Sequence, residues 1–514
     1  MSSVQSDSRL IKNVAANLSR LGAGWLVVLL MPPILVRSLD PSSYATWMLI
    51  LQFGAYATLF EGALQMATAR FVAYADGLGD PHLMRKMVSN SALLLTAFGV
   101  FVLLAIAIAS WKLGTFFPSI PMAILPQARP ALVITAAALA VCLPCSALAG
   151  TYIGLQRNEV PAVVSGVSRL FGAAGATWAA KHHQGLISMA LWTAAGTLLQ
   201  PLLYLITPSR SEWRPLLKLA HIGKDSLFEF GKFCSATLVT QFGALLITGL
   251  DLPIVASFDF PSLAYYSIAT TFSNVLVVPY GAIVSTIMPL AAGIVGEDSD
   301  ERRGAALIRA THLANALLCL MTMPIMLGMH SFLRLWVGRD YASHALTTSL
   351  VLVGAQTIRL TLMTYALVGF SAGQQSRMLV SPFVEGFVNL ALSLVLIRYM
   401  GAIGVALGTL CGAVVGIVIH FGVSMPRTDA VRFSRSRLFL QTILSPVIYT
   451  LPIAAAAFLC LRFMPTAIQQ GLLLGGAEIT LAAAFWLLYL EPEERSSLRR
   501  LIRRKLPLQE VTET

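Results

Sequence analysis

Charged residues are scarce in this sequence. Asp, Glu, Lys and Arg make up 12% of the 514 residues, whereas they make up about a quarter of a typical soluble domain. Hydrophobic residues account for 56%, and the mean hydropathy is +0.74. Apolar runs of about 20 residues, the length that a helix needs to cross the hydrocarbon core, recur along the chain. This composition excludes a soluble protein and predicts an all-α integral membrane protein, because the runs are too long and alternate too little for a membrane β-barrel.

Cysteines are also few, and they give no sign of a metal or redox site. All six lie in apolar segments. Cys142 and Cys145 have the CxxC spacing, but neither has a charged residue or a histidine beside it. Packing is therefore their expected role. We expect no metal, no cofactor and no catalytic residue.

Long polar loops and nucleotide-binding motifs are missing as well. The sequence has no GxxxxGK[ST] motif, which a phosphate-binding loop requires. The segments between apolar runs are too short for an added soluble domain. We therefore expect no enzyme, and a transport process driven by an ion gradient, the membrane potential or the substrate gradient.

About fourteen apolar segments are long enough to span a membrane. The predicted spans are residues 11–36, 43–70, 87–111, 129–155, 160–181, 186–207, 230–250, 262–294, 304–333, 346–371, 378–398, 402–425, 438–462 and 466–490.

The net charge of +12 follows the membrane topology and does not indicate a nucleic-acid partner. With the N-terminus in the cytoplasm, 25 of the 36 Lys and Arg residues lie in cytoplasmic segments or at the cytoplasmic ends of spans, eight lie outside or at the outer ends, and three lie in span interiors. Positive residues accumulate on the cytoplasmic side of membrane proteins. Both termini are therefore predicted to be cytoplasmic, and the basic tail is able to bind anionic membrane lipids.

The chain contains a weak internal repeat. GLQRNEVPAVVSGVSRLF, from Gly154, is similar to GQQSRMLVSPFVEGFVNL, from Gly373, and GLISMALWTAAGTLL, from Gly185, is similar to GAIGVALGTLCGAVV, from Gly401. Two parallel six-helix bundles, related by a pseudo-two-fold axis along the membrane normal, would produce this order. The predicted domains are an N-terminal bundle (1–207), a cytoplasmic linker (208–229), a C-terminal bundle (230–425), two extra helices (426–490) and a basic cytoplasmic tail (491–514).

Polar residues interrupt the first two predicted spans at membrane depth. Asn17 and Arg20 share a narrow strip of the first span, and Glu61 lies at a matching depth in the second, with Gln65 on its face. A charge buried in a membrane helix costs at least about 2.5–3.5 kcal/mol, so it needs water, a partner or a ligand. Two compatible interpretations remain open: a structural Arg20–Glu61 pair, and the polar wall of a water-filled cavity.

Three further charged residues lie within later spans. Arg359 is in the tenth span, Glu385 is in the eleventh, and Arg169 is in the fifth, which is the repeat equivalent of the eleventh. Each is able to form a structural ion pair. Arginine is also the side chain that binds phosphate through a planar fork and stays charged.

Other polar or small residues in the spans have simpler expected roles. Asp251 is predicted to close the seventh span near the outer face, as a cap or at the interface. Glu478 has no expected partner and is a candidate proton site. Gly404, Gly408 and Gly412 are four residues apart and predict a close helix-packing surface.

Several segments resemble one membrane-protein family. The first copy opens with NVAANLSRLGAGWLVVLLMPPILVRSLDPSSYATWMLIL, in which Arg37 to Tyr44 follow an R-x-L-(G/D)-P-x-x-Y turn with Asp40 where glycine is usual. DLPIVASFDFPSLAYYSIATTFSNVLVVPYGAIVSTIMP, LRLWVGRDY and NLALSLVLIRYMGAIGVALGTL follow in the second copy. These segments resemble Wzx-type polysaccharide-export flippases, of the multidrug/oligosaccharidyl-lipid/polysaccharide exporter superfamily, which implies a MATE-like fold.

The resemblance implies a cargo and a location. The cargo would be an undecaprenyl-diphosphate-linked oligosaccharide, moved by alternating access across the bacterial inner membrane for surface polysaccharide synthesis. H⁺ or Na⁺ coupling and a polysaccharide polymerase partner are compatible with it. The candidate substrate-binding residues are Asn17, Arg20, Glu61, Gln65, Arg169, Arg359 and Glu385, with the arginines serving the diphosphate or sugar acid groups.

Three alternatives remain open. A lipid II flippase or a multidrug or cation antiporter would share the superfamily fold. A membrane polysaccharide polymerase or ligase is less favoured, because it needs a large periplasmic loop with catalytic residues.

Overall fold

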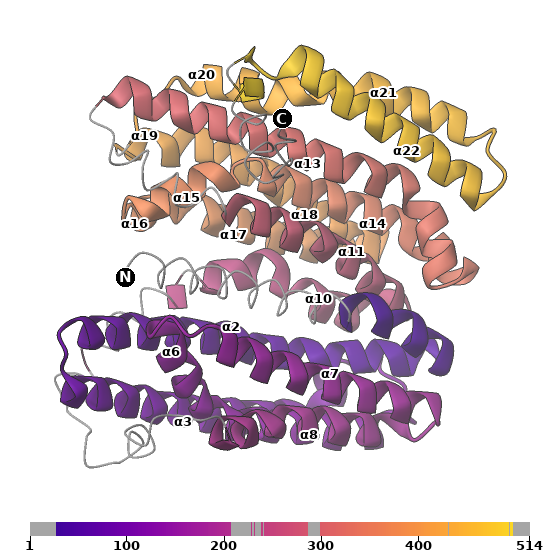
Figure 1. Cartoon of the computed structure of the whole chain (residues 1–514). Coiled ribbons are helices and arrows are strands. Elements are labelled where there is room, and N and C mark those ends of the chain that lie inside the picture. Colours follow the sequence, from indigo (N-terminus) through magenta and orange to yellow (C-terminus); the bar gives the residue numbers. More distant parts are fainter. Residues whose placement is uncertain are drawn as a thin grey trace, which may run out of the picture. The chain divides into compact units, whose positions relative to one another are not determined.

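The computed structural model describes residues 27–206, 228, 231, 238–239, 241–285, 299–429, 431–492 and 494–496. Within these residues every regular element is helical (Figure 1). The all-α membrane class expected from the composition is confirmed.

The described elements of the N-terminal half are long helices separated by short turns. They are α2 (Pro41–Gly77), α3 (Pro81–Trp111), α4 (Leu113–Phe116), α5 (Leu125–Cys142), η1 (Leu143–Cys145), α6 (Ser146–Gly154), α7 (Glu159–Lys181) and α8 (Gly185–Ile206).

The C-terminal half continues the pattern, with several π-helical turns. Its elements are η4 (Leu245–Gly249), α10 (Asp251–Phe258), α11 (Phe260–Ser285), α13 (Asp300–Trp336), α14 (Arg339–Leu360), α15 (Met363–Ser371), α16 (Gln375–Met378), α17 (Val380–Met400), α18 (Ala402–Ile419), η5 (His420–Ser424), α19 (Met425–Arg427), α20 (Arg435–Leu438), η6 (Phe439–Leu444), α21 (Ser445–Leu461), α22 (Ala467–Ala484) and η7 (Phe485–Tyr489).

Twelve helices of the described chain are long and apolar enough to cross a membrane. Helix α7, with 23 residues, is a further long helix, and Val27–Ser38 is a shorter apolar helix at the end of the predicted first span. The rest of that first span, including Asn17 and Arg20, lies outside the described residues.

Aspartate–proline pairs begin two of the spans. Asp40 precedes Pro41, and its side chain accepts the N–H of Ser43 at 2.9 Å. Asp80 does the same before α3, accepting the N–H groups of His82 and Leu83. The first helical position does not use its N–H in the helix, so proline fits there. The carboxylate before it accepts the free N–H groups of the residues that follow. Burial acts to raise the pKa of Asp40, but the hydrogen bonds from Ser43 and from the backbone of Asp40 and Ser42 together outweigh it and lower the pKa.

The predicted end of the seventh span was wrong. The helical path continues through the π turn η4 into α10, and the membrane-length segment is Gln241–Phe258. Asp251 therefore lies inside the span and is only 5% exposed. Its carboxylate is tolerated there because hydroxyl groups from neighbouring helices surround it, which a single helical segment cannot reveal.

The same helix interruption occurs in both halves of the chain. Helix α5 is separated from α6 by the tight turn η1, which begins at position 143, and α14 is separated from α15 by a break that begins at position 361, 218 residues later. The sequence repeat has nearly the same offset. This agreement supports two copies of one helical unit, while the predicted domain boundaries remain predictions.

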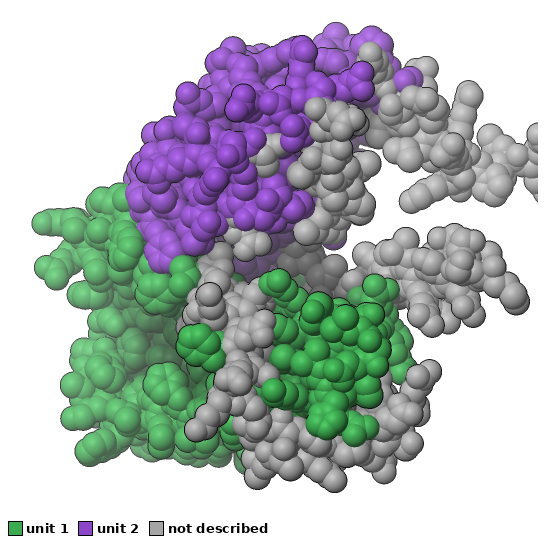
Figure 2. All heavy atoms as spheres, turned by 90° about the vertical axis from the view of Figure 1, so that its left-hand side faces the viewer, with its two compact units in different colours: residues 1–271, 386–409 green, residues 272–385, 410–514 purple. Residues whose placement is uncertain are grey.

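The described chain clusters into two compact units (Figure 2). Unit 1 comprises residues 1–271 and 386–409, and unit 2 comprises residues 272–385 and 410–514. In unit 1, α7 and α8 lie side by side, with Gly172 facing Gly196. In unit 2, α21 and α22 form a hairpin that packs on α13, and Phe485 and Tyr489 are buried in that contact.

Candidate functional site

The first carboxylate of the site is half-buried and held between α2 and α6. Glu61 of α2 accepts a hydrogen bond from the Ser146 hydroxyl, at the first residue of α6. Ser146 directly follows the three-residue 3₁₀ segment η1, which separates α5 from α6. The expected partner, Arg20, lies outside the described residues, so the predicted Arg20–Glu61 pair stays a prediction.

Small residues bring α6 very close to α2 beside this carboxylate. A Cβ atom on Gly150 would lie 2.7 Å from the Thr68 side chain and 2.8 Å from the backbone oxygen of Gln65. A Cβ atom on Gly154 would lie 2.5 Å from the backbone oxygen of Ala69. Ser146, Gly150 and Gly154 are four residues apart and form one helix face. This face fixes the position of Ser146 against Glu61.

Among the described residues, Arg169 of α7 is a cation whose charge acts on Glu61. Its positive charge interacts electrostatically with the Glu61 carboxylate, and its side chain is exposed. Among the described residues it forms no close ion pair. The site therefore combines a held carboxylate, Glu61, with an accessible guanidinium, Arg169. Gln65 lies on the face of α2 toward Gly150 and is half-buried.

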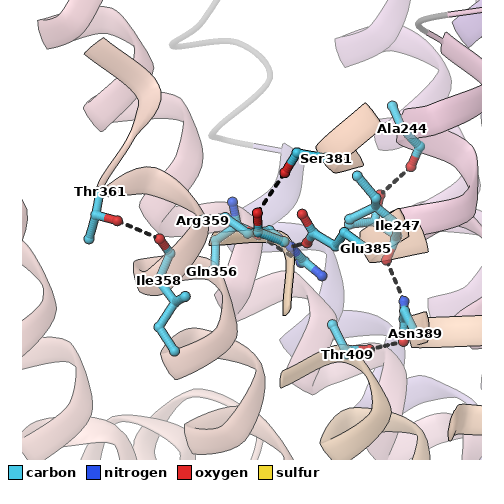
Figure 3. A network of polar contacts seen from close by, with 12 residues as sticks. Ala244, Ile247, Gln356, Ile358, Arg359, Thr361, Ser381, Glu385, Asn389 and Thr409 are labelled. Carbon is cyan, nitrogen blue, oxygen red and sulfur yellow. Dashed lines mark hydrogen bonds and ion pairs between the residues drawn. The ribbon is translucent and has the colours of Figure 1, made fainter. Parts of the chain in front are cut away.

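The second charged pair joins α14 and α17 in unit 2. The Arg359 guanidinium donates to the Glu385 carboxylate (Figure 3), and Glu385 is 8% exposed. Gln356, one turn before Arg359, lies 3.5 Å from it as a further acceptor. The sequence proposed both residues without pairing them, and the structure brings them together.

Helix α18 covers the other side of Glu385. A Cβ atom on Gly416 would lie 2.6 Å from the Glu385 carboxylate, and the Ser381 hydroxyl donates to the Gly416 carbonyl at 2.6 Å. The predicted close packing of this helix holds at Gly404 and Gly408, which approach Leu396 and Ser393. Glycine thus lets the helix backbone shield the ion pair.

A third polar cluster, in unit 1, was missed by the sequence. The Asp251 carboxylate accepts hydrogen bonds from Tyr266, at 3.0 Å, and from Thr409, at 3.1 Å. Asn389 of α17 donates to the Ile247 carbonyl in the η4 turn at 2.7 Å (Figure 3). The usable signals were a carboxylate in an apolar run and asparagine, serine and threonine on the eleventh and twelfth spans.

This cluster gathers several oxygen atoms around the Thr409 hydroxyl. The Thr409 hydroxyl lies within hydrogen-bond distance of Asp251, the Asn389 amide oxygen and the Val405 carbonyl, and Ser393 also points to Asn389. One hydroxyl proton serves one acceptor at a time. A carboxylate, an amide oxygen and hydroxyls form the donor set of a hard cation such as Na⁺, and the carboxylate alone is able to bind a proton. The described residues contain no group of three His, Cys, Asp or Glu side chains suited to a metal ion.

The fold recurs in solved transporter structures. The lipid II flippase MurJ, in an inward closed conformation, has a TM-score of 0.70 and 15% identity, over 96% of this chain and 100% of that one. An inward-facing multidrug resistance transporter of the MATE family has a TM-score of 0.61 and 16% identity, over 78% and 96%. The eukaryotic MATE transporter AtDTX14 gives 0.59 and 15%, over 85% and 98%.

These likenesses confirm a MATE-like transporter fold for this chain. No family model matches the sequence, and no curated protein matches it. The predicted Wzx-type family therefore rests on the quoted sequence segments alone.

Proposed function

We propose that this protein is a flippase for an undecaprenyl-diphosphate-linked oligosaccharide. It moves this lipid from the cytoplasmic to the periplasmic leaflet of a bacterial inner membrane, for the synthesis of a surface polysaccharide. The observation that carries the proposal is the presence of two arginines within long helices, Arg169 in α7 and Arg359 in α14.

The two arginines differ in readiness to bind. Arg169 is exposed and acts on Glu61 at a distance, so its guanidinium is available for a diphosphate oxygen. Arg359 is held by Glu385, so a phosphate or sugar acid must compete with that carboxylate. Bidentate contacts to phosphate favour arginine over lysine in both places.

A second candidate is the flipping of lipid II. The similarity to the lipid II flippase MurJ extends over 96% of this chain, whereas the MATE transporters compared above cover 78% and 85% of it. Lipid II also carries a diphosphate, so the same arginines would serve it.

Deletion of the gene from the source cell tests both candidates. Accumulated lipid-linked oligosaccharide together with lost surface polymer supports the first proposal, and mass spectrometry then identifies the sugar. Accumulated lipid II with unchanged surface polymer supports the second. Unchanged lipid pools with increased sensitivity to toxic compounds would overturn both in favour of a drug antiporter.

We further propose that ion coupling uses the cluster around Asp251, with Na⁺ or H⁺ as the ion. A ligand that binds only the folded state raises stability in proportion to the logarithm of its concentration. Sodium chloride should therefore raise the melting temperature of the purified protein more than potassium chloride does, and Asp251→Asn should abolish the difference. If the coupling ion is H⁺, the melting temperature should depend on pH and not on sodium. If the wild type and Asp251→Asn respond equally to sodium and equally to pH, the proposal is contradicted.

A further inference from the structure

We infer that the main-chain carbonyl of Gly249 couples the cluster around Asp251 to helix α2. This inference rests on the proposed ion coupling. It adds the route by which ion binding near Asp251 affects another span, α2. All the groups involved lie in unit 1.

The Gly249 carbonyl has lost its regular helical donor. In an α-helix this oxygen would accept the N–H of residue 253, but residue 253 is a proline and has no N–H. An unsatisfied carbonyl at membrane depth costs several kcal/mol, so it must find a donor elsewhere.

Helix α2 supplies that donor twice. The Gln52 side-chain amide donates to the Gly249 carbonyl at 3.1 Å, and the Tyr56 hydroxyl donates to the same oxygen. The two residues are four apart, so they lie on one face of α2. Glycine at 249 leaves room for this approach, because a Cβ atom there would lie 3.3 Å from the Tyr56 ring and 3.2 Å from Leu245, both tight contacts.

The other end of the same turn is tied to the polar cluster. Gly249 ends the π turn η4, whose Ile247 carbonyl accepts from Asn389, and Asp251 follows two residues later. A cation that takes oxygens of Asp251 and Asn389 therefore pulls on both sides of the turn. A π turn holds one extra residue relative to an α-helix, so a small local change rotates the Gly249 carbonyl relative to its donors on α2.

Hydrogen–deuterium exchange of the full-length protein in proteoliposomes tests this route without any lipid-linked substrate. Exchange is compared in sodium chloride and potassium chloride at one pH, and separately at acidic and neutral pH. In the wild type, the coupling ion should slow exchange in residues 241–258 and also in residues 49–58 of α2, by about fivefold for each hydrogen bond strengthened.

Two variants should disconnect the two segments. Gln52→Leu combined with Tyr56→Phe removes both donors, and Pro253→Ala returns an N–H that competes for the Gly249 carbonyl. In each, the ion should still protect residues 241–258 but should no longer protect residues 49–58. Thr58→Val, which removes a hydroxyl bonded only within α2, and Pro279→Ala in α11 are the matched controls and should behave as the wild type.

The outcomes separate this inference from the proposed cargo. Equal ion protection of α2 in the wild type and both variants would overturn the Gly249 route. Protection of neither segment by any ion would overturn the coupling and the route together, whatever lipid the protein moves.

Discussion

At the scale of single residues, the Arg359–Glu385 pair has two possible uses. It stabilises the fold as a structural ion pair, or Arg359 binds the substrate, and different measurements report the two. Both side chains are mostly buried, at 13% and 11% exposure. Breaking such a pair by removing one partner costs about 3–5 kcal/mol, because the other charge is left uncompensated. Removing both partners costs far less. Stability therefore reports the structural use, and transport reports the binding use.

We predict that Arg359→Ala lowers the melting temperature strongly and that adding Glu385→Ala restores most of the loss. Export of the lipid-linked substrate should stay abolished in the double variant, because the cation for the phosphate is still missing. Thermal unfolding of the purified proteins and complementation of the gene deletion measure the two effects. Normal export by a stable double variant would leave Arg359 with a structural role only.

Individual site residues could be nominated from the sequence, but most of their partners could not. Charges in apolar runs identified Glu61, Arg169, Arg359 and Glu385. The contact of Glu61 with Ser146 joins residues 85 positions apart in the sequence, and neither residue alone indicates the other. Asp251 was placed at the end of the seventh span, whereas its hydroxyl partners are Tyr266 on the next long helix and Thr409, 158 residues away.

At the scale of elements, the contact between α2 and α6 depends on the absence of side chains. Gly150 leaves no room for a Cβ atom between the Thr68 side chain and the backbone of α2. The glycine repeat in α18 was predicted as a packing surface. The α6 surface was not, because Ser146, Gly150 and Gly154 lie in a nine-residue helix whose boundaries the hydropathy profile does not show.

We predict that Gly150→Ala destabilises the protein by about 1–3 kcal/mol, the usual cost of overpacking. It should also reduce export, because α6 moves away from α2 and carries Ser146 from Glu61. Gly62→Ala is the matched control on α2, where an added Cβ meets nothing within 4 Å. Equal melting temperatures for the two variants would show that α6 adjusts without cost.

At the scale of the whole molecule, hydropathy was sufficient for the class and for most spans. Apolar length fixes where a helix must cross the membrane, so most predicted spans match observed helices within a few residues. The seventh was too short by one element, since a buried carboxylate lowers the local hydropathy although its partners make it tolerable. Orientation, by contrast, depends on the distribution of Lys and Arg and is a separate prediction.

We predict that the turns before α5 and between α21 and α22 face the periplasm, and that the turn between α2 and α3 faces the cytoplasm. In a cysteine-free background, Met122→Cys and Phe463→Cys should react with a membrane-impermeant maleimide in intact cells, because both positions are exposed, at 84% and 80%. Leu78→Cys, exposed at 60%, should react only after the cells are opened. The reversed pattern would show that the protein has the opposite orientation in the membrane. The arginines in the predicted spans would then meet a cytoplasmic diphosphate from the other end of their helices.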